Sequence, residues 1–228
     1  MVAHPRRIEL VVKVGGSLIE SGRLADTLAL LARARRGLVL VPGGGPFADA
    51  VRAAQAEQGL DDATAHRMAI LAMHQSALMM AGLCGRLVAA EALAEMRRTV
   101  ASGRIPVWLP LALSARDRSI PADWSITSDG LAARLAERLG VREVVLLKSC
   151  RVAPGRSAEE LAAAGIVDPL FPGIAARAGL RVHVLGPADM ASLEALLGMT
   201  HREPATLCDE QGRRNSTRVI GALADGKG

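Results

Sequence analysis

The stretch VVKVGGSLIE, residues 11–20, places a lysine inside an apolar run that ends at two glycines. An ammonium group on a buried strand costs free energy unless an anion meets it. Of the 28 basic residues, 25 are arginines, and only Lys13, Lys148 and Lys227 are lysines. Lys148 also ends an apolar run, VVLLKS. Two lysines at predicted strand ends indicate a need for a compact point charge, although surface lysines at a sheet edge would give the same pattern.

The composition fits a globular protein of one large or two small domains. The chain has 228 residues, half of them hydrophobic, and its aromatic residues are two tryptophans and two phenylalanines. The core is therefore expected to consist of Leu, Val, Ile and Ala. Three cysteines without metal-ligand spacing, together with the lack of a signal peptide, predict a cytoplasmic protein with reduced thiols. The apolar runs are too short to span a membrane, so no membrane partner is expected.

The net charge of +5 does not by itself indicate a nucleic-acid partner. The arginines are scattered along the chain, and four aromatic residues are too few for a base-stacking platform. A solvated, arginine-rich surface explains the charge, and its general field favours small anionic substrates. We therefore expect a small-molecule substrate and no nucleic acid.

Strand and helix patterns alternate along the chain. The predicted strands are 8–14, 38–41, 105–109, 141–148 and 181–185. The predicted helices are 24–35, 46–58, 63–82, 127–139, 157–164, 172–178 and 187–197. This alternation predicts an α/β fold, a three-layer αβα sandwich with a mainly parallel central sheet. From Glu203 onward the sequence is polar and Gly-rich, which is typical of a flexible tail or a loosely docked extension.

Glycines and polar residues gather beside three of the predicted strands. Glycines follow the first strand at 15–16 and the second at 43–45, and a polar segment, 123–129, precedes the strand that ends at Lys148. Ligands collect beyond the carboxyl ends of parallel strands, where glycines let the backbone approach an anion. Two such turns predict two anionic groups held close together, as phosphoryl transfer requires. Tight turns with positive φ are the other explanation, and neither turn is a Walker A loop or a dinucleotide fingerprint.

Taken in order, these motifs resemble the amino acid kinase family over roughly residues 8–200. They are VVKVGGS at 11–17, LVLVPGGGPFAD at 38–49 and TSDGLAARLAERLGVREVVLLKS at 127–149. Within the family, the short length and the run DWSITSD are similar to the small [5-(aminomethyl)furan-3-yl]methyl phosphate kinases of methanofuran biosynthesis. The resemblance implies a kinase that uses ATP, accompanied by Mg²⁺, to convert this small phosphate substrate to its diphosphate.

The resemblance also implies a role for each polar position. Lys13 would neutralise the transferring phosphoryl group, Asp129 would orient the catalytic lysines, and Lys148 would lie near the nucleotide. The remaining implied contacts are Gly15, Gly16 and Ser17 on the nucleotide side and Gly43, Gly44 and Gly45 on the acceptor side.

The resemblance further implies how the chain is divided and how it assembles. A kinase domain over 1–205 would bind the acceptor with about 1–120 and ATP with about 121–205, followed by a flexible tail at 206–228. Family members usually form dimers or hexamers, and the apolar helix at 63–82 suits an interface, so a homo-oligomer, a dimer or higher, is expected. Because Mg²⁺ binds largely through phosphate oxygens and water, no protein metal ligand is predicted.

One departure from the family pattern leaves alternatives open. N-acetylglutamate kinase has a second phosphate-binding lysine in a late glycine motif, whereas 149–226 contains no lysine here, which puts more weight on Lys148 or on an arginine. The alternatives are a uridylate or isopentenyl phosphate kinase, and a non-catalytic nucleotide-binding storage protein on the same fold. An amine-bearing furan requires a carboxylate near the acceptor, and Asp61 and Asp62 are the candidates.

Four further residues are candidates outside these motifs. His66 and His74 lie eight positions apart, so they either line one groove or are partly exposed helix residues. Arg52 either meets an acceptor phosphate or is solvated on its helix. Trp124 lies in the polar segment before Asp129, where it is a candidate to pack against a substrate ring.

Overall fold

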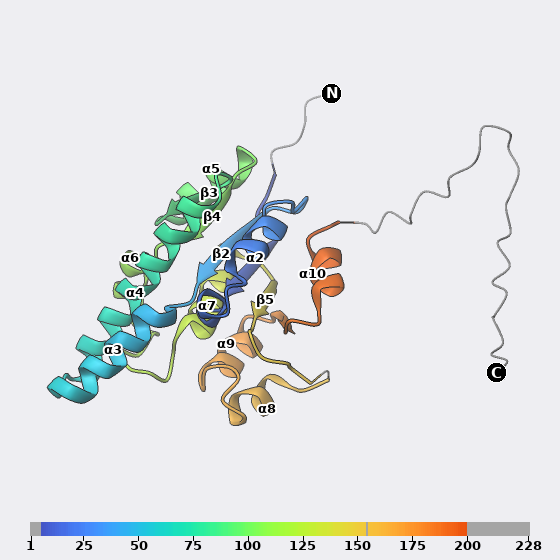
Figure 1. Cartoon of the computed structure of the whole chain (residues 1–228). Helices are drawn as coiled ribbons and strands as arrows, with labels where there is room; N and C mark the ends of the chain where they lie inside the picture. The colour runs from blue at the N-terminus through green and yellow to red at the C-terminus, as the bar shows by residue number, and fades with distance from the viewer. Residues whose placement is uncertain (1–5, 154, 200–228) are drawn as a thin grey trace, which may run out of the picture.

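The computed structural model describes residues 6–153 and 155–199, so the boundary predicted at 205 and the tail predicted at 206–228 lie outside the described residues. The strands are β1 (Leu10–Val14), β2 (Leu38–Pro42), β3 (Leu87–Ala90), β4 (Ile105–Trp108), β5 (Glu143–Leu147) and β6 (Arg181–Leu185). They form one sheet in the order β3-β4-β2-β1-β5-β6 (Figure 1). Every paired strand runs parallel to its neighbour, which confirms the predicted α/β architecture.

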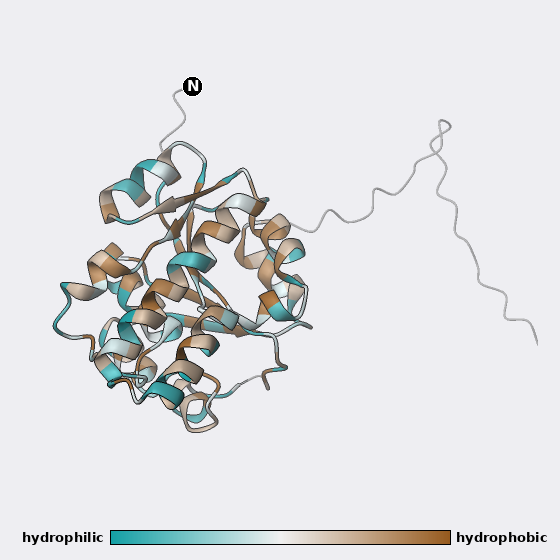
Figure 2. Cartoon of the chain, turned by 60° about the vertical axis from the view of Figure 1, so that its left-hand side comes forward, coloured by the Kyte–Doolittle hydropathy of each residue, from teal (hydrophilic) through white to brown (hydrophobic). Residues whose placement is uncertain are grey.

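Helices cover both faces of the sheet and complete the predicted three layers (Figure 2). They are α1 (Ser17–Glu20), α2 (Leu24–Leu31), α3 (Gly45–Gln58), α4 (Asp62–Leu83), α5 (Leu93–Ala101), α6 (Leu111–Ala115), α7 (Ser128–Leu139), α8 (Ala158–Ala163), α9 (Phe171–Arg177) and α10 (Met190–Leu196). None of these helices is both long enough and apolar enough to cross a membrane. The site described below depends mainly on α3, α4 and α7.

The central strand β1 contributes side chains to both cores. Successive side chains of a strand point to opposite faces of the sheet. Val11 accordingly packs in a core with residues of α7 and α9, whereas Val12 packs in a second core with residues of α2 and α10. Lys13 follows Val11 by two positions, so its side chain lies on the face that α7 covers. The fold thus directs the lysine of the first motif toward the start of a helix.

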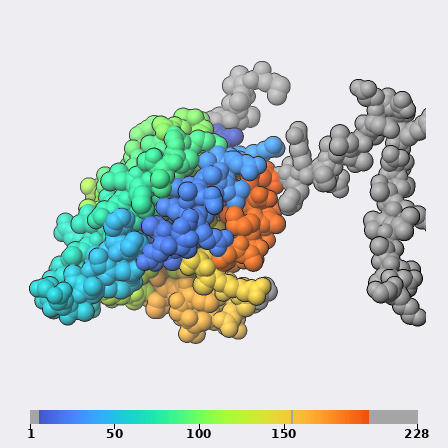
Figure 3. Space-filling model, in the orientation of Figure 1, coloured from blue at the N-terminus to red at the C-terminus, as the bar shows by residue number. Residues whose placement is uncertain are grey.

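Helix α10, near the end of the described chain, lies against α2. The Arg35 N–H, just after α2, donates a hydrogen bond of 3.0 Å to the backbone oxygen of Leu197, just after α10. Leu28 and Leu31 share a core with Leu193 of α10. In the space-filling view α10, in orange, accordingly lies beside the blue N-terminal segment (Figure 3). The last helix therefore closes the sheet face that α2 covers.

Two larger elements, β3 and α5, were not predicted from the sequence. They follow α4 and are joined by only two residues, Glu91 and Ala92. The segment is rich in Ala and Leu, so its period-2 and helical patterns cannot be separated by sequence alone. β3 is also the edge strand of the sheet, and its central residues are only half-buried. The short helices α1 and α6 were missed as well.

Candidate active site

A buried ion-pair cluster joins the ends of β1 and β5 to the first turn of α7. Lys13 lies in β1, Asp129 in the first turn of α7, and Lys148 directly after β5. Oδ1 of Asp129 lies 2.9 Å from Nζ of Lys13, and Oδ2 accepts a hydrogen bond of 2.7 Å from Nζ of Lys148. The structure therefore brings together the three charged residues that the motifs indicated.

The alternation of side chains along the strands explains why both lysines meet one carboxylate. Lys13 is the register partner of Leu146 in β5, and register partners on adjacent strands share a face of the sheet. Lys148 follows Leu146 by two residues, so its side chain points to the same face. Because α7 covers this face, its first turn can place one acidic residue between the two ammonium groups.

The charges of the cluster stabilise one another. Burial alone would raise the pKa of Asp129, but the ammonium groups of Lys13 and Lys148 outweigh it and hold that pKa below its ordinary value. Burial lowers the pKa of Lys148, the positive charge of Lys13 lowers it further, and Asp129 opposes both effects. With all three groups ionised the cluster has one excess positive charge, which suits it to attract an anion.

A carboxylate that sequence reasoning missed, Asp168, holds the start of α7. Its Oδ2 accepts hydrogen bonds of 2.7 Å from the backbone N–H groups of Thr127 and Gly130, so it caps the helix from a distant segment. Burial raises the pKa of Asp168. Lys148 also donates to the backbone oxygen of Ile166, which ties the same segment to the cluster. The run DPLFPG was visible in the sequence, but only the fold shows which helix it meets.

The two glycine turns pack against each other backbone to backbone. A β-carbon on Gly16 would lie 2.2 Å from the nitrogen of Gly45, and one on Gly43 would lie 2.4 Å from the nitrogen of Gly16. Gly16 has a φ of −61°, and among the glycines of both turns only Gly45 has a positive φ, 55°. Positive φ is therefore the wrong explanation for Gly15 and Gly16. A β-carbon on Gly16 would meet the other turn, and one on Gly15 would lie 2.7 Å from the backbone oxygen of Leu147.

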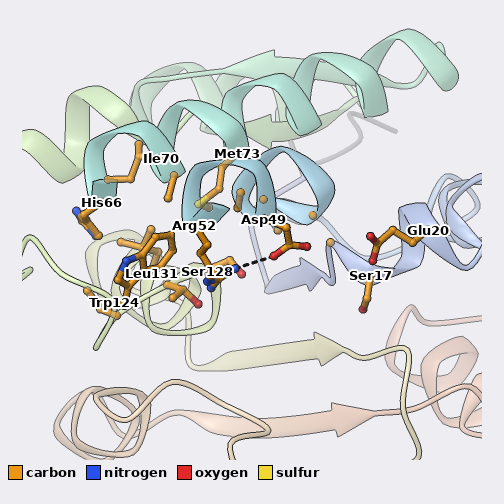
Figure 4. Close-up of a pocket in the computed structure, with 18 residues that line it drawn as sticks. Ser17, Glu20, Asp49, Arg52, His66, Ile70, Met73, Trp124, Ser128 and Leu131 are labelled. Carbon is orange, nitrogen blue, oxygen red and sulfur yellow. Dashed lines mark hydrogen bonds and ion pairs between the residues drawn. The ribbon is translucent and has the colours of Figure 1, made fainter. Parts of the chain in front are cut away.

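A pocket of about 250 Å³ lies beside the paired turns (Figure 4). Its walls come from both turns, α1, α3, α4 and the start of α7, and its lining residues are Gly16, Ser17, Glu20, Gly43, Gly44, Gly45, Ala48, Asp49, Arg52, His66, Ala69, Ile70, Met73, Trp124, Ile126, Thr127, Ser128 and Leu131. Among the predicted site residues, Lys13, Gly15, Asp129 and Lys148 do not line it, although their chain neighbours Gly16 and Ser128 do. Helix α3 begins at this pocket without a side-chain cap. Its second residue, Pro46, has no N–H group, so only the other backbone N–H groups of the first turn can meet an anion.

A clamp of three side chains fixes the loop 116–127 to α3 at one end of the pocket. The guanidinium carbon of Arg52 lies 4.3 Å from the centre of the Trp124 ring. Nε1 of Trp124 donates a hydrogen bond of 2.7 Å to Gln55, and Nη1 of Arg52 donates one of 2.8 Å to Asp49. Trp124 is therefore a half-buried pocket residue with a defined position. Arg52 lines the pocket but keeps 52% of its side chain exposed, so it is also the solvated helix residue that the sequence allowed.

The two histidines of α4 do not share the pocket. His66 is buried in the pocket wall, and burial lowers its pKa. His74 instead accepts a hydrogen bond of 2.9 Å from the Leu111 N–H and lies outside the pocket wall. Eight residues correspond to a rotation about 80° beyond two full helical turns, which is enough to separate the two rings. The hypothesis of one common groove is wrong.

The carboxylates of the pocket differ from those that we expected. Asp61 caps α4 by accepting a hydrogen bond of 2.8 Å from the Thr64 N–H, and Asp62 accepts one of 2.8 Å from Gln55. Neither lines the pocket. Glu20 and Asp49 line it instead, and Figure 4 shows both on the side nearest Ser17. Sequence reasoning missed Glu20 because an exposed acidic residue on a helix has no motif signal of its own, and it gave no role to Asp49 although that residue ends the second motif.

The C-terminal half contains a separate cavity of about 220 Å³. It lies between β6, α8 and the loop after β5, and its lining residues are Val152, Ala153, Gly155, Arg156, Ala158, Leu161, Val182 and Val184. The lining is mainly apolar with one arginine, a composition that can accept a flat ring and a nearby phosphate.

Comparisons with known proteins agree with this arrangement. The family model described as "Amino acid kinase family" matches residues 9–150. The [5-(aminomethyl)furan-3-yl]methyl phosphate kinase of Methanocaldococcus jannaschii is 30% identical over 138 residues, which span 60% of this chain and 63% of the relative. The match thus covers less than two thirds of that relative's length.

Solved structures of similar fold include uridylate kinases. That of Archaeoglobus fulgidus has a TM-score of 0.61 at 17% identity, covering 84% of this chain and 96% of the other. The UMP kinases of Ureaplasma parvum and Bacillus anthracis give TM-scores of 0.63 and 0.64 at 12% and 14% identity, covering 86% of this chain and 97% and 94% of theirs. At these identities the likeness shows the fold alone.

Proposed function

Because this chain belongs to the amino acid kinase family, we propose that it is an ATP-dependent kinase whose acceptor is itself a phosphate. The proposed acceptor is [5-(aminomethyl)furan-3-yl]methyl phosphate, converted to its diphosphate, as the name of the M. jannaschii relative suggests. The observation that carries the proposal is the buried Lys13–Asp129–Lys148 cluster beside a glycine-lined pocket.

The cluster suits phosphoryl transfer better than proton transfer. The transition state is loose, so catalysis depends mainly on positioning and on neutralising charge at the phosphoryl oxygens. Lys13 and Lys148 supply that charge from a rigid, buried position. Asp129 is ionised and uses both oxygens on the lysines, so it positions them and is not free to accept a proton. A phosphate acceptor is already ionised at neutral pH and needs no general base.

The pocket beside the glycine turns suits a small phosphorylated ring as the acceptor. The backbone of the glycine turn that leads into α3 would hold the acceptor phosphate, and Arg52, which is paired with Asp49, lies further along the same helix. The Trp124 ring and the apolar Ile70 and Met73 offer a surface for a flat ring at the other end (Figure 4). Glu20 supplies negative charge for an amine, which neither UMP nor isopentenyl phosphate carries, whereas Asp49 is already paired with Arg52.

Mg²⁺ would reach the site with ATP. In the part of the chain that the structure describes, no group of three or more His, Cys, Asp or Glu residues could hold a metal ion. Asp129 does not fit as a direct ligand, because both of its oxygens face lysines. We therefore expect phosphate oxygens and water to hold the ion, which would supply additional positive charge to the phosphates when bound.

We also propose the division of the chain into two parts and its assembly into a homo-oligomer. The part up to about residue 120 would supply most of the acceptor pocket, and the part from about 121 to 205 would bind ATP, with the cavity behind α8 as its nucleotide site. On α4, Leu71, Leu78 and Leu83 are 42%, 60% and 58% exposed. Leu71 and Leu78 lie seven positions apart and therefore on one side of the helix, and an exposed apolar pair of this kind suits packing against a second copy of the chain.

The proposal is tested by measuring ADP release from Mg·ATP with a panel of acceptors. The panel contains the furan phosphate, UMP, isopentenyl phosphate, N-acetylglutamate and aspartate. We expect turnover with the furan phosphate and little with the others. Turnover with UMP or isopentenyl phosphate alone would reassign the acceptor. Tight ATP binding without ADP release on any acceptor would favour the storage protein.

A further inference from the structure

A second cavity, of about 360 Å³, adjoins the acceptor pocket. The two cavities share only His66 and Ile70 of α4. The rest of the second cavity is formed by the first turns of α4, by α6 and by the loop 116–127. The same loop carries Trp124 into the acceptor pocket, so one segment of chain walls both cavities. None of the motifs or the kinase chemistry described above uses this second cavity.

Two polar atoms in the wall of this cavity are buried without a partner. Oγ of Ser114 and Nε2 of His66 make no hydrogen bond to any of the described residues. Ser114 is 8% exposed and His66 is 7% exposed. Buried polar atoms are nearly always hydrogen-bonded, and leaving one unpaired costs free energy. Both residues belong to the wall, so unpaired hydrogen-bonding capacity remains at the cavity.

The charges around the cavity favour an anion. Arg67 and Arg118 belong to its wall and make no ion pair within residues 6–153 and 155–199. Asp117 is the carboxylate in the wall, but its charge is already neutralised. Arg134 donates hydrogen bonds of 2.6 and 3.2 Å to it, and Arg138 donates one of 3.1 Å. The two exposed guanidinium groups are thus the uncompensated charges at the cavity.

The rest of the wall is apolar, with Ile70, Leu111 and Ile120 among its residues. We propose that this cavity is a binding site for a small organic anion, with an anionic head at Arg67 and Arg118 and an apolar body along the three hydrophobic side chains. The size of the cavity falls within the range of small-molecule sites. This site is separate from the acceptor pocket and does not depend on the proposed kinase activity.

Binding is tested by ¹⁹F NMR on the full chain with 4-(trifluoromethyl)benzoate, and with 4-(trifluoromethyl)benzamide as its neutral counterpart. We expect the benzoate to bind with a Kd of about 1 mM or lower and the amide at least about tenfold more weakly. Arg118→Ala should weaken benzoate binding at least about fivefold, because it removes one head-group cation. Ala115→Phe, at an exposed wall position, should abolish binding by filling the cavity.

Two control variants test whether the benzoate binds through general surface charge or in the acceptor pocket instead of at this site. Arg116→Ala removes a neighbouring exposed arginine that does not line the cavity, and Ser17→Leu alters the acceptor pocket from α1, away from the loop 116–127. Both should leave benzoate binding unchanged. Undetectable benzoate binding, equal binding of the amide, or loss of binding in Ser17→Leu would each overturn the proposal. If Ala115→Phe does not fold, as judged by circular dichroism, Ser114→Ala replaces it and should weaken binding without closing the cavity.

Discussion

Nζ of Lys13 lies 2.9 Å from Oδ1 of Asp129, and the side chains of both residues are almost fully buried. This contact explains how a strand in the middle of the sheet can carry a buried charged residue. The ammonium group of Lys13 is compensated by a carboxylate that α7 delivers from more than a hundred residues away in the sequence. Asp129 holds Lys148 with its other oxygen, so the stability of the cluster and its proposed chemistry depend on the same three groups.

Replacing Lys13 should reduce the catalytic rate while leaving the fold intact. Lys13→Met keeps the length and apolar stem of the side chain but removes its charge, while Asp129 keeps its pair with Lys148. We expect kcat to fall at least about 100-fold, because a charge that neutralises the transferring group is lost. Circular dichroism and thermal unfolding check that the fold survives. Near-normal turnover in a folded Lys13→Met protein would disprove the role that we assign to this residue.

Asp129 should make a contribution to stability that depends on pH. Its pKa is lowered in the folded state, so the folded protein binds this proton less readily than the unfolded chain. The contribution is therefore fully present above the unfolded pKa of about 3.9 and is lost as the pH falls through the folded pKa. Asp129→Asn should be less stable than the wild type at pH 7, because it leaves two neighbouring ammonium groups uncompensated.

Urea unfolding of both proteins across pH measures this contribution. The stability difference between the wild type and Asp129→Asn should be constant from neutral pH down to about 5 and should shrink at lower pH. A difference that stays the same down to acid pH would show that ionisation of Asp129 does not stabilise the fold.

The glycine turns should tolerate no added methyl group where their backbones meet. Gly16→Ala places a β-carbon 2.2 Å from the nitrogen of Gly45, so the two turns must separate. We expect loss of both activity and stability, measured by turnover and thermal unfolding. Gly82→Ala is the matched control, since a β-carbon there meets nothing within 4 Å and the position is helical. The control should be neutral or slightly stabilising, because alanine favours a helix by about 0.5–1 kcal/mol over glycine.

The clamp between Arg52 and Trp124 should affect acceptor binding more than chemistry. Trp124→Phe keeps an aromatic ring but loses the hydrogen bond to Gln55, and Trp124→Ala loses both. We expect the acceptor KM to rise in the order wild type, Trp124→Phe, Trp124→Ala, with the KM for ATP unchanged. Steady-state kinetics with each substrate varied in turn measures this order. Equal effects on the KM values of both substrates would show a general structural role instead.

A polar residue on the exposed face of α4 should disrupt the proposed oligomer. Leu78 is 60% exposed, so Leu78→Glu is compatible with the folded single chain but would bury a charge in an interface. We expect multi-angle light scattering to show a dimer or larger species for the wild type and a smaller species for the variant. A monomeric wild type would contradict the proposal directly.

Much of the fold followed from local patterns. The glycine turns, the strands that lead into them and the long helix at 63–82 were predictable because each carries its own periodicity or turn chemistry. β3 and α5 were not, because their Ala- and Leu-rich segment favours strand and helix alike. The choice there depends on pairing with β4, a contact that no local pattern encodes.

The site, like the fold, was predictable only in part. By itself, the sequence determined that lysines stand at two strand ends, that glycines follow two strands and that an aspartate begins a helix. Only the tertiary structure decided that Asp129 holds both lysines, that Asp168 caps α7, and that Glu20 and Asp49 rather than Asp61 and Asp62 line the pocket. The sequence shows the type of each residue and the pattern formed with its neighbours along the chain. The residues that it meets in space depend on the strand order and on the helix that covers each face of the sheet.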